Sequence, residues 1–87
     1  MTRYVVTVVP AVEKQLNGLR DRALRARLYA AIAGLRDDPR PPGVKKMVGS
    51  ADEWRVRVGT WRVVYRVDDG RLVVLVAKAG SRADVYR

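Results

Sequence analysis

Four arginines occur within Trp54-Arg55-Val56-Arg57-Val58-Gly59-Thr60-Trp61-Arg62-Val63-Val64-Tyr65-Arg66, a stretch that predicts a β-hairpin. A tight turn at Gly59-Thr60 would place Arg57 directly opposite Arg62. Arg55 would then lie on the same face of the sheet, because side chains alternate along a strand. The stretch therefore predicts three arginines that converge on one face.

Like charges that oppose each other across two strands weaken a hairpin by up to about 1 kcal/mol. The pairing becomes favourable if a polyanion covers that face, because each guanidinium can hold a phosphate by two hydrogen bonds. The alternative interpretation is a solvated strand face, where charge preserves solubility and protects a sheet edge. For three converging arginines we favour anion binding.

The chain has 87 residues with no cysteine and no histidine, and 18 basic and nine acidic residues give a net charge of +9. This length predicts one domain, residues 1–87, with one core. The missing cysteines exclude a disulfide framework, a thiol nucleophile and a zinc–cysteine site. The missing histidines remove the usual general base and the commonest metal ligand. The basic surface suits nucleic acid, an acidic protein partner or an anionic membrane.

No apolar run approaches the ~20 residues that span a bilayer, and no signal peptide opens the chain. We therefore expect no membrane segment. The absence of cysteine suits a reducing compartment, so the expected location is cytoplasmic.

The N-terminal half predicts one strand and two helices. Residues 3–9 are β-branched and aromatic, which predicts a short buried strand that ends at Pro10. Pro10 suits the first turn of a short helix that weakens at Asn17-Gly18. A second helix is expected over residues 21–36, with Asp21 as its N-cap. The apolar stripes of the two helices are Val12, Leu16 and Leu19, then Leu24, Leu28, Ala31, Ile32 and Leu35.

The second helix also carries arginines outside its apolar stripe, which we interpret mostly as solvated, with a second nucleic-acid or partner contact as the alternative. Residues 37–43 predict a stiff irregular connection, and residues 44–49 are expected to begin the next strand, with a loop at 50–53. Asp69-Gly70 predicts a type I′ turn. Residues 72–77 predict a central strand buried on both faces, because their apolar run barely alternates. Residues 80–87 form a tail.

The expected fold class is α+β, with the order β-α-α-β-β-β and a mostly antiparallel four-stranded sheet. A two-helix hairpin packs on one face of the sheet, and the arginines lie on the other, partly open face. The residues expected to supply core on the helix side are Trp54, Val56, Val58, Trp61, Val63 and Tyr65.

Several motifs together resemble the RelE toxins of the RelE/ParE superfamily of bacterial toxin–antitoxin pairs. They are Asp37-Asp38-Pro39-Arg40-Pro41, the segments Trp54–Gly59 and Trp61–Tyr65, Asp68-Asp69-Gly70, and Gly80-Ser81-Arg82-Ala83-Asp84-Val85-Tyr86. The resemblance covers nearly the whole chain and preserves the order of the motifs.

This resemblance implies a ribosome-dependent mRNA endonuclease that inhibits translation. Such toxins enter the vacant A site and cut the codon there with neither a metal nor a small-molecule cofactor. The 2′-hydroxyl of the mRNA attacks the adjacent phosphate. The implied partners are the ribosome with its A-site mRNA and a cognate antitoxin, which a +9 surface would bind through an acidic amphipathic segment.

The resemblance also implies roles for individual residues. Arg55 and Arg57 occupy the two basic positions beside the scissile phosphate, and Arg62 stabilises charge in the transition state. Arg82 contacts the leaving group or a phosphate, and Tyr86 orients or stacks against a base. The alternative for Arg82 and Tyr86 is that they attach the tail to the sheet.

Three lysines, Lys45, Lys46 and Lys78, are candidate RNA-binding residues, with a solvated lysine as the alternative for each. Well-studied relatives often carry lysine where this chain has Arg55 and Arg57, and many carry histidine where Ser81 stands. Arginine is a poor proton acceptor, so this site would act mainly through electrostatics and geometry, and its general base is not identified.

Two other functions remain open. One is a non-enzymatic inhibitor of DNA gyrase of the ParE type, which would need no convergent arginines. The other is a plain nucleic-acid-binding module, whose binding would fall steeply with salt and leave no cleaved product.

Overall fold

The computed structural model describes residues 3–49 and 52–81. Its helices and strands are β1 (Val5–Val8), α1 (Pro10–Asn17), α2 (Arg22–Gly34), β2 (Lys45–Lys46), β3 (Glu53–Val58), β4 (Trp61–Asp68) and β5 (Val73–Ser81). The strands form one sheet in the order β1-β5-β4-β3-β2, in which β1 runs parallel to β5 and the other neighbours are antiparallel. The predicted α+β class and mostly antiparallel sheet are confirmed.

The number of strands differs from the prediction. Four strands were expected, and the fifth is β2, a two-residue strand that pairs Lys45 with Arg55 and Lys46 with Trp54. The predicted start of a strand in residues 44–49 is thus a separate edge strand. Glu53, expected in the preceding loop, is the first residue of β3.

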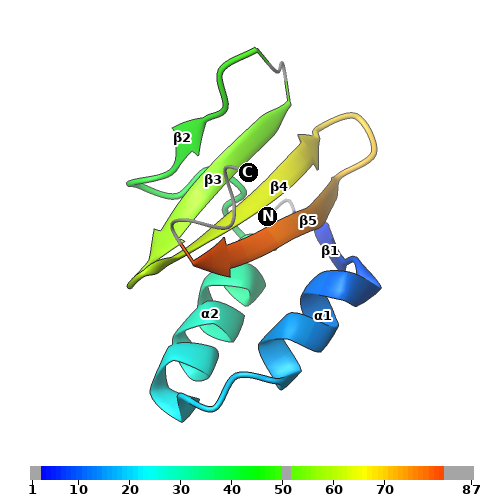
Figure 1. Ribbon diagram of the computed structural model, residues 1–87. Helices are drawn as coiled ribbons and strands as arrows, with labels where there is room; N and C mark the ends of the chain where they lie inside the picture. The colour runs from blue at the N-terminus through cyan, green and yellow to red at the C-terminus, as the bar shows by residue number, and fades with distance from the viewer. Residues whose placement is uncertain (1–2, 50–51, 82–87) are drawn as a thin grey trace.

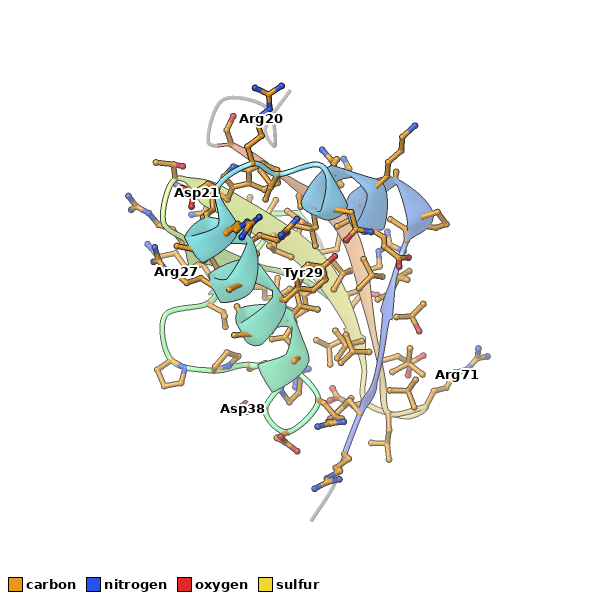
Figure 2. All side chains as sticks on the ribbon, turned by 90° about the horizontal axis from the view of Figure 1, so that it is seen from below. Arg20, Asp21, Arg27, Tyr29, Asp38 and Arg71 are labelled. Atoms are coloured by element: carbon orange, nitrogen blue, oxygen red, sulfur yellow. The ribbon has the colours of Figure 1, made fainter. Side chains whose placement is uncertain are left out.

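Both helices pack against the same face of the sheet (Figure 1). Pro10 begins α1 and Asn17 ends it, as predicted. Asp21 lies at the start of α2 (Figure 2), and its carboxylate accepts a hydrogen bond from the backbone N–H of Leu24 at 3.0 Å, which confirms the predicted N-cap. The second helix ends at Gly34, before the predicted boundary at residue 36.

The core lies between the helices and the sheet. Its fully buried side chains include Val12, Leu16, Leu28, Leu35, Val63, Tyr65, Val74 and Val76. The predicted core residues of the hairpin all belong to this cluster or pack against it. Within the described residues, neither helix is long and apolar enough to cross a membrane.

Two strands are less buried than predicted. Strand β1 lies at the sheet edge, and Val5 is 64% exposed, so it is not a buried strand. Strand β5 alternates: Val74 is fully buried against the helix side, whereas Leu75 is only half-buried. The helices cover one face alone, which explains why an apolar run here does not indicate burial on both faces. Strand β5 also extends to Ser81, into the predicted tail.

The loop between β4 and β5 is not the predicted type I′ turn. Asp68 and Val73 are its last paired residues, and the positive φ falls on Leu72 (56°) and not on Gly70. A carboxylate oxygen of Asp68 accepts the backbone N–H of Arg71 at 3.0 Å, which stabilises a longer loop.

The Asp69 side chain makes long-range contacts, and Asp69 does not belong to the predicted type I′ turn. Its carboxylate accepts two hydrogen bonds from the Arg40 guanidinium, at 2.8 and 3.2 Å, and one from the Tyr4 hydroxyl at 2.6 Å. The hydrogen bonds from Arg40, and then that from Tyr4, hold the pKa of Asp69 below its ordinary value. These contacts, which we call the Asp69 clamp, join β1, the connection after α2 and the β4–β5 loop.

A second contact fixes the same connection to the core. The buried Tyr65 hydroxyl donates a hydrogen bond to the Pro39 carbonyl oxygen at 2.7 Å. The guanidinium of Arg40 lies 5.2 Å from the centre of the Trp54 ring, within the range of a cation–π contact. The Asp37–Pro41 motif therefore has a structural role, because it attaches the segment that precedes β2 to the sheet.

We expect Asp69→Asn to lower the melting temperature at neutral pH, because the clamp loses its charge. The folded pKa of Asp69 is depressed, so its stabilisation is complete above the unfolded pKa of about 4 and is lost as the pH falls through the folded value. The difference in melting temperature between Asp69→Asn and wild type should therefore shrink only below about pH 4. Thermal unfolding followed by circular dichroism at a series of pH values measures this.

Asp37→Asn is the control, because the Arg3–Asp37 pair is a single exposed contact of 3.5 Å. Equal melting temperatures for wild type and Asp69→Asn at pH 7 would contradict the role of the clamp.

We expect Tyr65→Phe to lower the free energy of unfolding by about 1 kcal/mol, because the buried Pro39 carbonyl loses its donor. For a domain of this size, that corresponds to a decrease of about 4–8 °C in melting temperature. Tyr29→Phe removes an exposed hydroxyl that donates to the Asn17 side chain, and it should cost less.

Alkaline unfolding gives a second measurement for Tyr65→Phe. Burial raises the pKa of Tyr65 to about 12 in the folded protein. The unfolded value is about 10, so this stabilisation is complete below pH 10 and is lost as the pH rises toward the folded value. Because Tyr65→Phe has no hydroxyl to ionise at this position, its stability should fall less than that of wild type as the pH rises above 10. A melting temperature for Tyr65→Phe equal to that of wild type would show that the hydroxyl contributes nothing.

Candidate active site

The register of the β3–β4 hairpin agrees with the prediction. Arg57 is paired with Arg62, and Arg55 with Val64. Gly59 adopts a positive φ of 58° at the turn, a conformation that glycine adopts without strain. The three arginines share the face of the sheet opposite the helices, because the residues between them are in the core.

These arginines line one cavity of about 250 Å³, together with Gly43 and Lys45. Arg55 and Arg62 are half-buried and Arg57 is exposed. The Arg57 Nε atom donates a hydrogen bond to the Gly59 carbonyl oxygen at 3.5 Å, which ties the guanidinium to the hairpin turn. The predicted convergence of Arg55, Arg57 and Arg62 is thus present in the folded chain, and we call this cavity with its five lining residues the arginine cavity.

Lys45 enters the arginine cavity from the short edge strand β2. It is paired with Arg55, so it projects from the same face of the sheet. Lys46, its neighbour, is paired with Trp54 and projects from the opposite face. Of the two adjacent lysines, only Lys45 joins the predicted site.

A β-bulge places Lys78 on the arginine face. Val64 pairs with Lys78 and Tyr65 pairs with Val76, which leaves Ala77 as an extra residue in β5. Lys78 is exposed and is separated from Arg55 by Val64, so it extends the basic surface without lining the arginine cavity. Beyond the bulge, Gly80 is paired with Arg62.

The same face also contains an arginine outside the cavity. Arg66 pairs with Glu53, with 3.8 Å between the guanidinium Nε and a carboxylate oxygen. It lies two residues beyond Val64 on β4, away from the hairpin turn. The charge of this arginine is therefore balanced by an acid within the sheet.

Two predicted site residues, Arg82 and Tyr86, lie outside the described residues. Gly43 lines the cavity and was not predicted as a site residue. The signal was the Pro41-Pro42-Gly43 sequence, which only Val44 separates from the lysines. Gly43 has a φ of 94°, and the backbone N–H of Val44 donates to the Pro41 carbonyl at 3.2 Å. This turn brings the chain into β2.

The arginine cavity suits an anion. The charged residues among its described lining, Lys45, Arg55, Arg57 and Arg62, are all cationic, and guanidinium groups match the geometry of phosphate oxygens. Across residues 3–49 and 52–81, no group of three or more histidine, cysteine or acidic residues could hold a metal ion. Chemically, the cavity can hold a phosphate and stabilise negative charge that develops on its oxygens.

Comparisons with known proteins identify the family of the chain. Residues 6–86 match the family described as the ParE toxin of the type II toxin–antitoxin system parDE. The toxin RelG of Mycobacterium tuberculosis is 31% identical over 84 residues, which is 97% of each chain.

Solved structures of RelE toxins also resemble this chain. In the archaeal RelE–RelB complex from Pyrococcus horikoshii OT3, the matching chain is 30% identical with a TM-score of 0.82, covering 98% of this chain and 100% of that one. The isolated RelE toxin of E. coli is 25% identical with a TM-score of 0.77, covering 95% and 90%. The chain therefore belongs to the RelE/ParE family of toxins of type II toxin–antitoxin systems.

Proposed function

We propose that this toxin is a ribosome-dependent endoribonuclease that cleaves mRNA in the A site and so inhibits translation. The observation that carries the proposal is the convergence of Arg55, Arg57 and Arg62 on one cavity of about 250 Å³. A set of opposed like charges that costs the free protein stability is expected where a polyanion binds. The ribosome as target places this activity in the cytoplasm.

In the proposed reaction, the 2′-hydroxyl of the RNA attacks the adjacent phosphate and expels the 5′-oxygen of the next nucleotide. Arg55 and Arg57 hold the phosphate oxygens and fix the geometry for in-line attack. Arg62, paired with Arg57 across the hairpin, stabilises the charge that develops in the transition state. Arg82 would contact the leaving group or a phosphate, and Tyr86 would orient a base. Lys45 would lie beside the bound phosphate and Lys78 would bind a flanking phosphate, whereas Lys46 projects from the other face.

We also propose that a cognate antitoxin binds this toxin. The structural relative from Pyrococcus horikoshii is a complex of RelE with RelB. A chain with a net charge of +9 and a basic sheet face favours a partner with an acidic amphipathic segment.

A second candidate function is inhibition of DNA gyrase. The family that matches residues 6–86 is described as the ParE toxin, and the chain has no histidine for general base catalysis. This function would use the fold as a binding module and would require no reaction in the arginine cavity.

We expect Arg62→Ala to reduce the cleavage rate on stalled ribosomes by about 10²–10³-fold, because one group that stabilises transition-state charge is removed. Arg66→Ala is the matched control, since Arg66 lies on the same strand and face but pairs with Glu53 outside the cavity. Primer extension on mRNA in programmed ribosomes measures the rate, and thermal unfolding verifies that both variants fold. Full activity of Arg62→Ala would exclude the role assigned to this arginine.

We expect the purified toxin to arrest translation in a reconstituted system and to leave DNA supercoiling by gyrase unchanged. The two assays, run with the same preparation, separate the two candidate functions because ribosomes and gyrase are present in different reactions. Inhibition of supercoiling with normal translation would replace the nuclease proposal with the gyrase proposal. Ribosome binding without a cleaved product would favour the function of a plain nucleic-acid-binding module over the nuclease proposal.

A further inference from the structure

The proposed reaction requires a group that accepts the proton of the attacking 2′-hydroxyl. The arginines of the cavity cannot do this, because a guanidinium keeps its proton at all pH values at which proteins work. The chain contains neither histidine nor cysteine. Gly43 contributes only backbone. Among the described residues that line the arginine cavity, Lys45 alone has a side chain that exists both with and without its proton.

The position of Lys45 suits that role. Its pairing with Arg55 puts the two side chains on the same face of adjacent strands, where directly opposed Cβ atoms lie roughly 4.5–5.5 Å apart. A phosphate held by Arg55 would therefore have the flexible lysine stem beside it. Lys45 comes from the sheet edge, so its amine approaches the phosphate from a different strand than Arg57 and Arg62 do.

The charged groups around Lys45 are mostly cationic. Arg55 and Arg57 on β3 and Arg62 on β4 share its cavity, and Lys78 lies beyond Val64 on β5. Glu53 is the acid on the same face of β3, and it pairs with Arg66 instead of lining the cavity. No carboxylate among the described lining residues could accept the proton in place of Lys45.

We propose that Lys45, from the edge strand β2, is the proton acceptor for the 2′-hydroxyl in the arginine cavity. The inference rests on the proposed endoribonuclease function. The neutral amine of Lys45 takes the proton while the 2′-oxygen forms its bond to phosphorus. The bond from phosphorus to the 5′-oxygen breaks, and the departing oxygen takes a proton from water. The products are a 2′,3′-cyclic phosphate and a free 5′-hydroxyl.

The first test compares Lys45→Arg with Lys46→Arg in single-turnover cleavage on programmed ribosomes. Both variants keep the charge and chain length of the strand, but only Lys45→Arg removes the proton acceptor. General base catalysis contributes roughly 10²–10⁴-fold, so Lys45→Arg should lose at least about 10²-fold in rate with unchanged ribosome affinity. Lys46→Arg should retain the wild-type rate, since Lys46 projects from the other face.

The pH dependence separates proton transfer from simple charge. Only an unprotonated amine can accept a proton, so general base catalysis by Lys45 predicts a wild-type rate that rises with pH, and this rise should be absent in Lys45→Arg. A purely electrostatic role for Lys45 would be fulfilled by arginine at every pH. Wild-type rate and wild-type pH profile in Lys45→Arg would overturn the proposal.

A chemical rescue uses the absence of cysteine in the chain. In Lys45→Cys, 2-bromoethylamine modifies the single thiol at position 45 and restores an aminoethyl side chain of lysine length. Its sulfur withdraws electrons, so this amine is a weaker base than lysine. The modified protein should regain cleavage, and its pH profile should move to lower pH. Rescue without such a movement would assign Lys45 a positioning role and overturn proton transfer.

The tests distinguish the inference from the function on which it rests. Cleavage by wild type together with equal cleavage by Lys45→Arg refutes the inference alone. No cleavage by wild type on ribosomes, with intact folding, refutes the endoribonuclease function and therefore the inference as well.

Discussion

The register of the β3–β4 hairpin is the constraint on which the rest of the site depends. A slip of β4 by one residue would turn Arg62 toward the helices, away from Arg55 and Arg57, and would bring the core residues of that strand to solvent. Val63 and Tyr65 are fully buried, and burial of each such side chain is worth about 1.5–3 kcal/mol. The repulsion between opposed arginines costs up to about 1 kcal/mol. The core therefore fixes the register against the repulsion.

The Asp69 clamp and the Tyr65–Pro39 hydrogen bond connect this hairpin to the cavity edge. They fix residues 38–40 against the sheet, and the following turn at Gly43 leads directly into β2. Because β2 has only two residues, its position depends on the segment before it as much as on its own pairing with β3. The Asp37–Pro41 motif, which resembles the family sequence, thus has a structural role, because it positions the strand that brings Lys45 to the arginine cavity.

The sequence was informative where interactions are local. The turn at Gly59-Thr60 and the alternation around it predicted the pairing of Arg57 with Arg62, and Asp21 predicted the start of α2. The sequence was misleading where a residue far away in the chain determines the local structure. Asp69-Gly70 suggests a tight turn, but Arg40 and Tyr4 bind the Asp69 carboxylate. The bulge at Ala77 and the face of each lysine in β2 depend on pairing with strands elsewhere in the chain, which periodicity within a segment does not reveal.

The free protein already has its cations in one place, so binding a phosphate requires little rearrangement of β3 and β4. Arg57 and Arg62 are opposed across the hairpin, and a phosphate bound beside them would offset their mutual repulsion. Part of the stability that this pairing costs the sheet would then be recovered on binding. Arginine performs this function better than lysine, because its planar group binds two oxygens at once, but it cannot remove a proton. The hairpin contributes only arginines to the described lining of the cavity, so under the proposed function phosphate binding falls to β3 and β4 and proton transfer to the amine that β2 supplies.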